Sequence, residues 1–317
     1  MDHANDVEVV TSREVPLGGP RAMSVRRTLP QRQRSLVGAW CFADHYGPDD
    51  VAATGGMDVP PHPHTGLQTV SWLFAGEVEH RDSGGVHALV RPGELNLMTA
   101  GRGIAHSEVS TPGTTTLHGV QLWVALPEGA RDGDRGFDHY VPPAVPLAGG
   151  SVRVVLGSLA GSSSPVRTHT PLLGAEVLVD PRSEVVLRVD PAFEHGVLVD
   201  AGPVLLDDVK LAPAELGFVD TGADRLHVAN PGDDPARVML LGGTPFEEPL
   251  VMWWNFVARS HDEVVAFREQ WQAGSDRFGE VEGYVGATQH LPAPPLPNAR
   301  IQPRLHPPGP GDRSAWG

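Results

Sequence analysis

The sequence predicts an all-β protein of the sandwich or barrel type, assembled from many short strands. The 317 residues include 37 glycines and 31 prolines, a composition that favours strands joined by tight turns over long helices. Apolar and polar residues alternate in short runs, and turn signals separate these runs at intervals of about 8 to 12 residues. A chain of this length is expected to form two domains of ordinary size.

The first group of predicted strands lies in the first half of the chain. Residues 67–90 read as a strand, a turn at "SGG" and a second strand. Residues 91–110 add a turn, a strand, a glycine bend at Gly101 to Gly103 and another strand, and residues 114–127 add one more. A second strand-rich block follows the segment "YVPPAVPLAGG" and is organised in a similar way.

One helix is predicted, over residues 261–273. Ser260 and Glu263 form a capping box at its start, and Gly274 can end it. Its apolar face, expected to pack on a barrel, consists of Val264, Phe267 and Trp271. Residues 291–317 are rich in proline and lack periodicity, so we expect a disordered tail there.

Charge and composition exclude several classes of function. The formal net charge of −15 argues against direct binding of nucleic acid, because phosphate contacts need clustered cations. The single cysteine, Cys41, excludes an internal disulfide and a cysteine-based zinc site. The N-terminus lacks a secretory pattern, and no apolar run reaches the roughly 18 residues that cross a bilayer, so we expect a cytoplasmic protein without membrane contact.

Two pairs of side chains indicate a metal site. His62 and His64 flank Pro63, and side chains two residues apart on a strand share one face. His106 and Glu108 repeat this spacing about 40 residues downstream, after the glycine bend. If two facing strands bring the pairs together, three imidazoles and one carboxylate can hold one ion and leave positions open for water or substrate. The alternative is that the histidines are surface residues of a proline loop.

This ligand set favours particular metals. Imidazole and carboxylate ligands suit Fe(II), Mn, Ni, Co or Cu, and the set is less typical of a closed structural zinc site, although zinc remains possible.

The segments "HPHTGLQTVSWLFAGEV", "PGELNLMTAGRGIAHSE" and "LHGVQLWVALP" resemble the core of the pirin family, a branch of the cupin superfamily. The resemblance is close over most of residues 10–145 and weaker in the second half. It implies a bicupin, in which two cupin-type β-barrels lie face to face and the N-terminal barrel holds one metal, usually iron. The family ligands fall on His62, His64, His106 and Glu108.

The resemblance also sets the expected domain boundaries and activities. Residues 1–145 would form the metal-binding cupin domain, and residues 146–290, with the helix, a cupin domain without metal. Some pirins cleave flavonols such as quercetin with dioxygen, which makes a quercetin 2,3-dioxygenase-type enzyme the first hypothesis. The alternative is a non-enzymatic, iron-dependent regulator that binds a transcriptional or metabolic protein partner. A third hypothesis is a storage or stress cupin with a vestigial metal site. We expect a monomer.

Two residues are the candidates for catalysis. Glu108 is expected to act as a ligand and as a base for an enolic aromatic substrate. Gln68 occupies a position where many pirins have glutamate. It lies an even number of residues after His62 and His64, and side chains at such spacings share one face of a strand, so we expect it to face the metal. The glutamine keeps hydrogen-bonding ability but lacks charge and basicity, so a mechanism that needs a second carboxylate base becomes less secure.

Other polar and aromatic residues are weaker candidates. His195 and His227 are interpreted as packing or surface residues, and His80 and His87 as solvated hairpin histidines that could line the mouth. His118 is interpreted as either a satisfied core histidine or a residue behind the metal ligands. Arg102 could pair with an anion. Three further residues could grip a flat ring but have core packing as their default role: Trp72, Phe74 and Met98.

Overall fold

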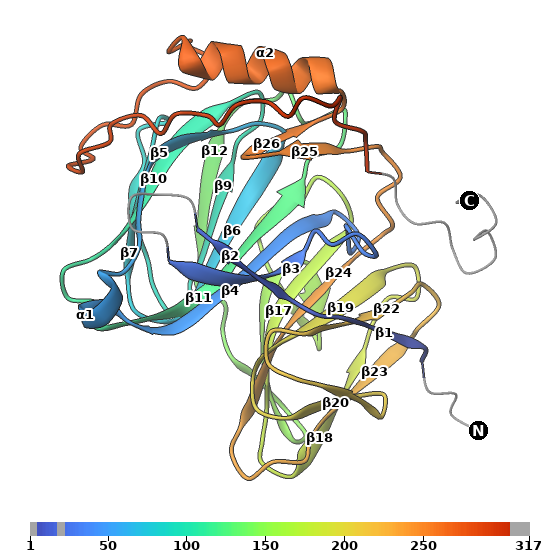
Figure 1. Cartoon of the computed structure of the whole chain (residues 1–317). Coiled ribbons are helices and arrows are strands. Elements are labelled where there is room, and N and C mark those ends of the chain that lie inside the picture. Colours follow the sequence, from blue (N-terminus) through green and yellow to red (C-terminus); the bar gives the residue numbers. More distant parts are fainter. Residues whose placement is uncertain (1–4, 18–22, 305–317) are drawn as a thin grey trace.

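The structure is a computed structural model that describes residues 5–17 and 23–304. It confirms an all-β fold with two β-barrels and one long helix (Figure 1). No helix in these described ranges has the length and apolar character needed to span a membrane.

The first barrel consists of two antiparallel sheets. The larger sheet contains, in spatial order, β12 (Gly136–Tyr140), β9 (Leu95–Thr99), β6 (Leu67–Ala75), β11 (Thr116–Ala125), β4 (Trp40–Asp50), β3 (Ser24–Leu29) and β2 (Arg13–Pro16). The smaller sheet contains β5 (Asp58–His64), β10 (Ile104–Ser110), β7 (Val78–Asp82) and β8 (His87–Val90). A single turn of helix, α1 (Val51–Thr54), connects β4 to β5.

The second barrel repeats this arrangement of a seven-stranded and a four-stranded sheet. The larger sheet contains β1 (Val7–Val10), β22 (Leu216–Val219), β19 (Glu194–Ala201), β24 (Ala236–Gly243), β17 (Leu172–Val179), β14 (Gly150–Leu156) and β13 (Val145–Leu147). The smaller sheet contains β18 (Ser183–Arg188), β23 (Arg225–Asn230), β20 (Val204–Leu206) and β21 (Val209–Leu211). A short hairpin, β15 (Ser158–Leu159) and β16 (Ser162–Ser163), is attached to it.

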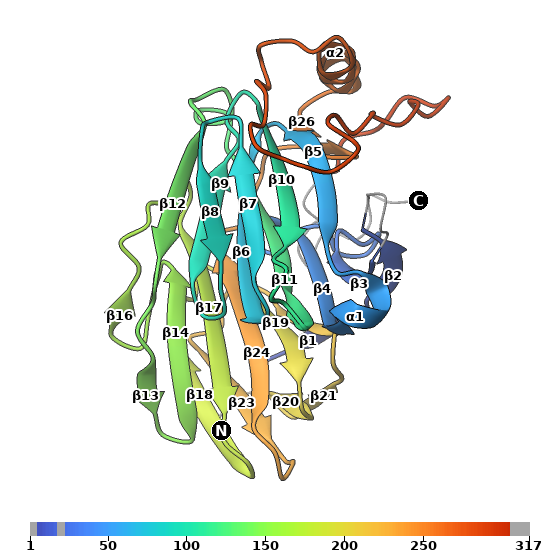
Figure 2. The same cartoon turned by 90° about the vertical axis from the view of Figure 1, so that its left-hand side faces the viewer.

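The two larger sheets share one hydrophobic core, and Figure 2 shows the barrels one below the other. On β24, Met239 and Leu241 belong to this shared core, whereas Val238 and Leu240 belong to the core of the second barrel. Both faces of the strand are therefore buried, which explains its continuous apolar run. Trp40 of the first barrel is fully buried and donates from Nε1 to the carbonyl oxygens of Leu173, at 3.0 Å, and Gly242, at 3.2 Å.

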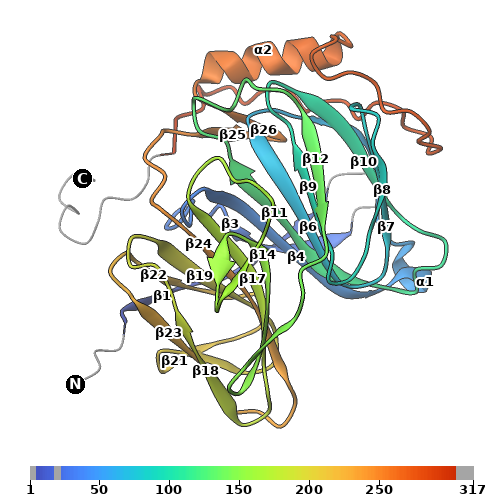
Figure 3. The same cartoon turned by 180° about the vertical axis from the view of Figure 1, so that it is seen from behind.

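The two ends of the chain depart from the predicted domain boundaries. Strand β1 pairs with β22 and so lies in the sheet of the second barrel. After the second barrel, the chain returns to the first through the hairpin β25 (Val251–Trp253) and β26 (Phe256–Ala258) and the helix α2 (His261–Gln272). Figure 3 shows α2 lying across the end of the first barrel.

The helix forms where the sequence predicts it. The hydroxyl of Ser260 accepts a hydrogen bond from the amide of Glu263 at 3.2 Å, and the predicted face is buried. The prediction of disorder after residue 290 is wrong for residues 291–304. The amide of Leu291 donates to the carbonyl of Pro61, and Leu250 and Arg304 form a β-bridge, so contacts across the fold order this proline-rich segment. Residues 305–317 lie outside the described residues.

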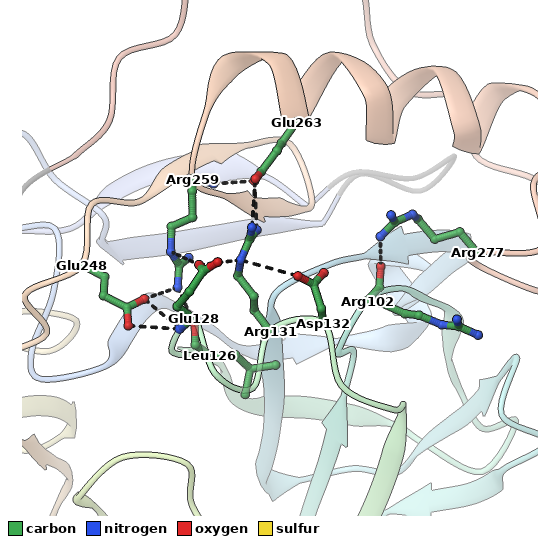
Figure 4. A network of polar contacts seen from close by, with 9 residues as sticks. All are labelled: Arg102, Leu126, Glu128, Arg131, Asp132, Glu248, Arg259, Glu263 and Arg277. Carbon is green, nitrogen blue, oxygen red and sulfur yellow. Dashed lines mark hydrogen bonds and ion pairs between the residues drawn. The ribbon is translucent and has the colours of Figure 1, made fainter.

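An ion network fastens α2 to the first barrel (Figure 4). The guanidinium of Arg131, in the loop after β11, makes two 2.9 Å hydrogen bonds to the carboxylate of Glu263. Arg259 pairs with Glu248 at 2.5 Å and donates from Nη2 to the carbonyl of Leu126. The network joins three segments that are far apart in sequence.

Candidate metal centre

The predicted histidine pairs lie on neighbouring antiparallel strands. In the register of β5 and β10, His62 is opposite His106 and His64 is opposite Ile104. Three prolines in β5 can be accommodated because it is the edge strand of its sheet, where a missing N–H breaks no ladder. The pleat then places His62, His64 and His106 on the same face.

The three imidazoles converge and are buried. The Nε2 atoms of His64 and His106 are 3.0 Å apart, and the ring centroids of the three residues are 4.3 to 5.0 Å apart. One nitrogen from each ring lies within 4.8 Å of the other two. The side chains therefore form a compact group of the kind that holds one transition-metal ion.

Backbone carbonyls fix two of the rings. Nδ1 of His62 donates to the carbonyl of Pro60 at 2.8 Å, and Nδ1 of His64 donates to the carbonyl of Asn255 at 3.0 Å. Because a carbonyl can only accept, these bonds place the proton on Nδ1 and leave a lone pair on Nε2 of the neutral rings.

Burial also keeps these rings neutral. It lowers the pKa of His62 to about 4 and lowers the pKa of His64 and His106 well below the ordinary value of histidine. Neutral imidazole is the form that binds a metal. The residues present therefore fit the expected cofactor.

Glu108 lies beside the three-histidine group. The ladder between β5 and β10 shifts register between His106 and Glu108. The carboxylate of Glu108 lies close to the imidazoles of His106 and His80, within 4.8 Å by their ligand atoms. Burial raises its pKa, and Ser71 Oγ lies 3.4 Å from Oε1. Its place as the fourth ligand stays a prediction.

The interpretation of His80 as a solvated hairpin histidine is wrong. The side chain is buried, not solvated: its Nε2 lies 3.1 Å from Oδ2 of Asp82, and its Nδ1 lies 3.4 Å from Nδ1 of His106. The spacing of His80 and Asp82 on one strand was the signal available in the sequence. His87, on the same hairpin, is half exposed and pairs with Glu79, in agreement with the solvated interpretation.

Gln68 does not lie on the same strand as His62 and His64. His64 ends β5, and Gln68 lies in β6, which belongs to the other sheet. Because a turn separates the two strands, the even spacing between these residues does not show that their side chains share a face. Gln68 is buried, and its Nε2 donates to Thr99 Oγ1 at 2.9 Å. Its Oε1 has no hydrogen-bond partner among the described residues. That it faces the metal stays a prediction.

The aromatic neighbour of the site differs from the candidates named from sequence. Trp123 lies edge-on to His64, with ring centroids 5.1 Å apart, and stacks on Phe42 at 4.0 Å. Trp72 and Met98 belong to the shared core, and Phe74 contacts His118. The alternation in the strand "LHGVQLWVA" could not reveal the contact with His64, because β5 lies in another sheet.

The remaining candidates fall outside this site. His118 lies 2.6 Å from Asp200 of the second barrel. His195 is fully buried, and His227 is half-buried on β23. Arg102 is exposed between Gly101 and Gly103. At Gly101, with φ of +52°, a Cβ would lie 2.2 Å from the carbonyl oxygen of Gly133, which supports the interpretation as a backbone bend.

Comparison with known proteins agrees with this architecture. Residues 22–124 match the pirin family model, and residues 174–279 match the model of the pirin C-terminal cupin domain. The fold is similar to a crystal structure titled as quercetin 2,3-dioxygenase from Acinetobacter baumannii, with a TM-score of 0.88. The two sequences are 39% identical, and the match covers 94% of this chain and 97% of that one.

Curated relatives lead to the same family. A Pseudomonas aeruginosa protein named "Putative quercetin 2,3-dioxygenase" is 42% identical over 93% of this chain and 92% of its own length. A pirin-like protein of Caulobacter vibrioides is 34% identical over 86% of this chain and 96% of its own. The two barrels, the matched models and these relatives together show that the chain is a bicupin of the pirin family.

Proposed function

We propose that this chain is a metal-dependent dioxygenase that cleaves flavonol-like enolic aromatics, with His62, His64, His106 and Glu108 as metal ligands. The convergence of three buried, neutral imidazoles carries the proposal. The names of the similar proteins from Acinetobacter baumannii and Pseudomonas aeruginosa support the reaction class.

Iron is the metal that this ligand set and the family favour. Imidazole and carboxylate ligands with open positions are typical of non-haem Fe(II) sites, and Mn, Ni, Co, Cu and Zn are the alternatives. When bound, such an ion supplies Lewis acidity and redox chemistry towards dioxygen.

The protein side chains contribute proton transfer and orientation. The raised pKa of Glu108, caused by burial, suits a carboxylate that accepts the proton of an enolic hydroxyl. The amide of Gln68 is a neutral hydrogen-bonding group for the same substrate, and its Oε1 is the atom available for this. The indole of Trp123 offers an apolar surface beside His64.

The test is an aerobic assay with purified, iron-loaded protein and quercetin. We expect saturable loss of flavonol absorbance with release of carbon monoxide. His62→Ala is expected to abolish both metal binding and turnover, and Glu108→Gln to lower kcat/KM by about 100-fold or more. His87→Ala, on the exposed hairpin, is the matched control and is expected to match the parent protein.

Stoichiometric iron without turnover on a flavonol panel would contradict the enzymatic proposal. That result would favour the alternative, a regulatory metalloprotein that docks on a protein partner. The net charge of −15 is compatible with a protein partner rather than DNA.

A further inference from the structure

A second group of metal-ligating side chains lies between the two barrels. His45 on β4 and His118 on β11 belong to the first barrel, and Asp200 on β19 belongs to the second. Nε2 of His45 and Nε2 of His118 each lie 2.6 Å from Oδ1 of Asp200. His45 and Asp200 are almost completely buried, and the side chain of His118 is 13% exposed.

Both imidazoles contact the same carboxylate oxygen. His45 makes a hydrogen bond to Oδ1 of Asp200, and Nε2 of His118 pairs with that oxygen at the same distance. The three ligand atoms lie within 4.8 Å of one another, so the group is compact enough to hold one ion.

The surroundings orient the carboxylate. Nη1 of Arg237 donates to Oδ2 of Asp200 at 3.1 Å, so only Oδ1 is directed at the imidazoles. Outer partners of this kind fix the orientation of metal ligands. Nε of Arg237 in turn lies 3.2 Å from Oε1 of Glu176.

The types of ligand atom indicate which ions could bind. The group offers two nitrogens and one oxygen, which suits first-row ions such as Zn²⁺ better than Ca²⁺ or Mg²⁺, because those two need several oxygen ligands.

We propose that His45, His118 and Asp200 form a second metal site, specific for a first-row divalent ion such as Zn²⁺, that links the two barrels. Zinc binds nitrogen and oxygen ligands at about 2.0 to 2.2 Å, so tetrahedral ligand atoms lie about 3.3 Å apart. The observed 2.6 Å contacts are about 0.7 Å shorter than this, so both imidazoles would move away from Oδ1 when the ion binds. In the three-histidine group the closest nitrogens are likewise only 3.0 Å apart.

The test measures zinc bound per chain after dialysis, by elemental analysis and calorimetry. We expect two ions in the full chain. The variant His62→Ala/His106→Ala, which removes ligands only from the first centre, should retain one. Adding His118→Ala should reduce the remaining zinc to none, whereas adding His87→Ala should leave it unchanged.

The same samples are checked for correct folding. Circular dichroism spectra and the Tm of the metal-free protein identify variants that are unfolded. If His118→Ala is unfolded, His118→Gln is used in its place. Zinc should raise the Tm of the His62→Ala/His106→Ala variant, because an ion bound only by the folded state stabilises it. The proposal fails if that variant binds no zinc at ten times its molar concentration, or if its zinc persists after His118→Ala. Neither result depends on dioxygenase activity.

Discussion

The carbonyl oxygen of Asn255 lies 3.0 Å from Nδ1 of His64, although the two residues are 191 positions apart. Asn255 sits in the two-residue turn between β25 and β26, where Trp254 adopts a left-handed φ of 53°. The amide of Val257 donates to the carbonyl of Thr65 at 3.1 Å and holds this hairpin against the histidine segment. A segment that follows the second barrel therefore orients a candidate ligand in the first.

Inserting one glycine between Trp254 and Asn255 should weaken metal binding by about 10- to 100-fold, because it moves the carbonyl that fixes the tautomer of His64. Calorimetric titration of the metal-free protein measures the change. Asn255→Ala keeps the backbone carbonyl and should bind as the parent does. Equal affinities for the insertion and the parent would show that this hydrogen bond does not orient the ligand.

His80 should act as a positioning residue for His106. Its contacts with Asp82 and His106 place it behind the candidate ligand, so His80→Ala is expected to keep one ion in the centre but to weaken its affinity about 10- to 100-fold. The control His87→Ala lies on the same hairpin and should have no effect. Complete loss of the ion in His80→Ala would instead identify His80 as a ligand.

Trp40→Phe should destabilise the protein by about 2 to 4 kcal/mol. The change leaves a cavity in the shared core and removes the donor for the carbonyls of Leu173 and Gly242. Urea denaturation followed by circular dichroism measures this. Trp253→Phe, at a partly exposed position of the hairpin, serves as the control and should cost less than half as much. A similar loss in both variants would argue against the special role of the inter-barrel contact.

Glu263→Gln should lower stability at neutral pH by about 1 to 2 kcal/mol, with the deficit fading in acid. Burial acts to raise the pKa of Glu263, but its bonds to Arg131 and to the amide of Arg259 outweigh this and lower it. The stabilisation is therefore present above the unfolded pKa of about 4.3 and is lost as pH falls through the lower folded value.

Thermal unfolding between pH 3 and pH 7 measures this pH dependence. Asp262→Asn, which removes the exposed pair with Arg300, should show no measurable change. A pH-independent deficit in Glu263→Gln would mean that the ion pair is not its cause.

Local patterns in the sequence were sufficient for the strands, the helix and the histidine pairs. Strand and helix periodicities are properties of neighbouring residues, so the capping box at Ser260 and the shared face of His62 and His64 could be predicted. The family motifs added the pairing of these histidines with His106. The spacing between His64 and Gln68 could not predict which way Gln68 points, because a turn and a change of sheet separate the two residues.

The β architecture and the side chains that can bind a metal thus follow from local sequence patterns and family motifs. The burial of His80, the return of Asn255 to orient His64 and the contact of Asp200 with His45 from another barrel follow only from the folded arrangement. It also ordered residues 291–304, whose local composition indicated disorder. These contacts join residues far apart in the chain, and their free energy depends on packing and burial that no local period encodes.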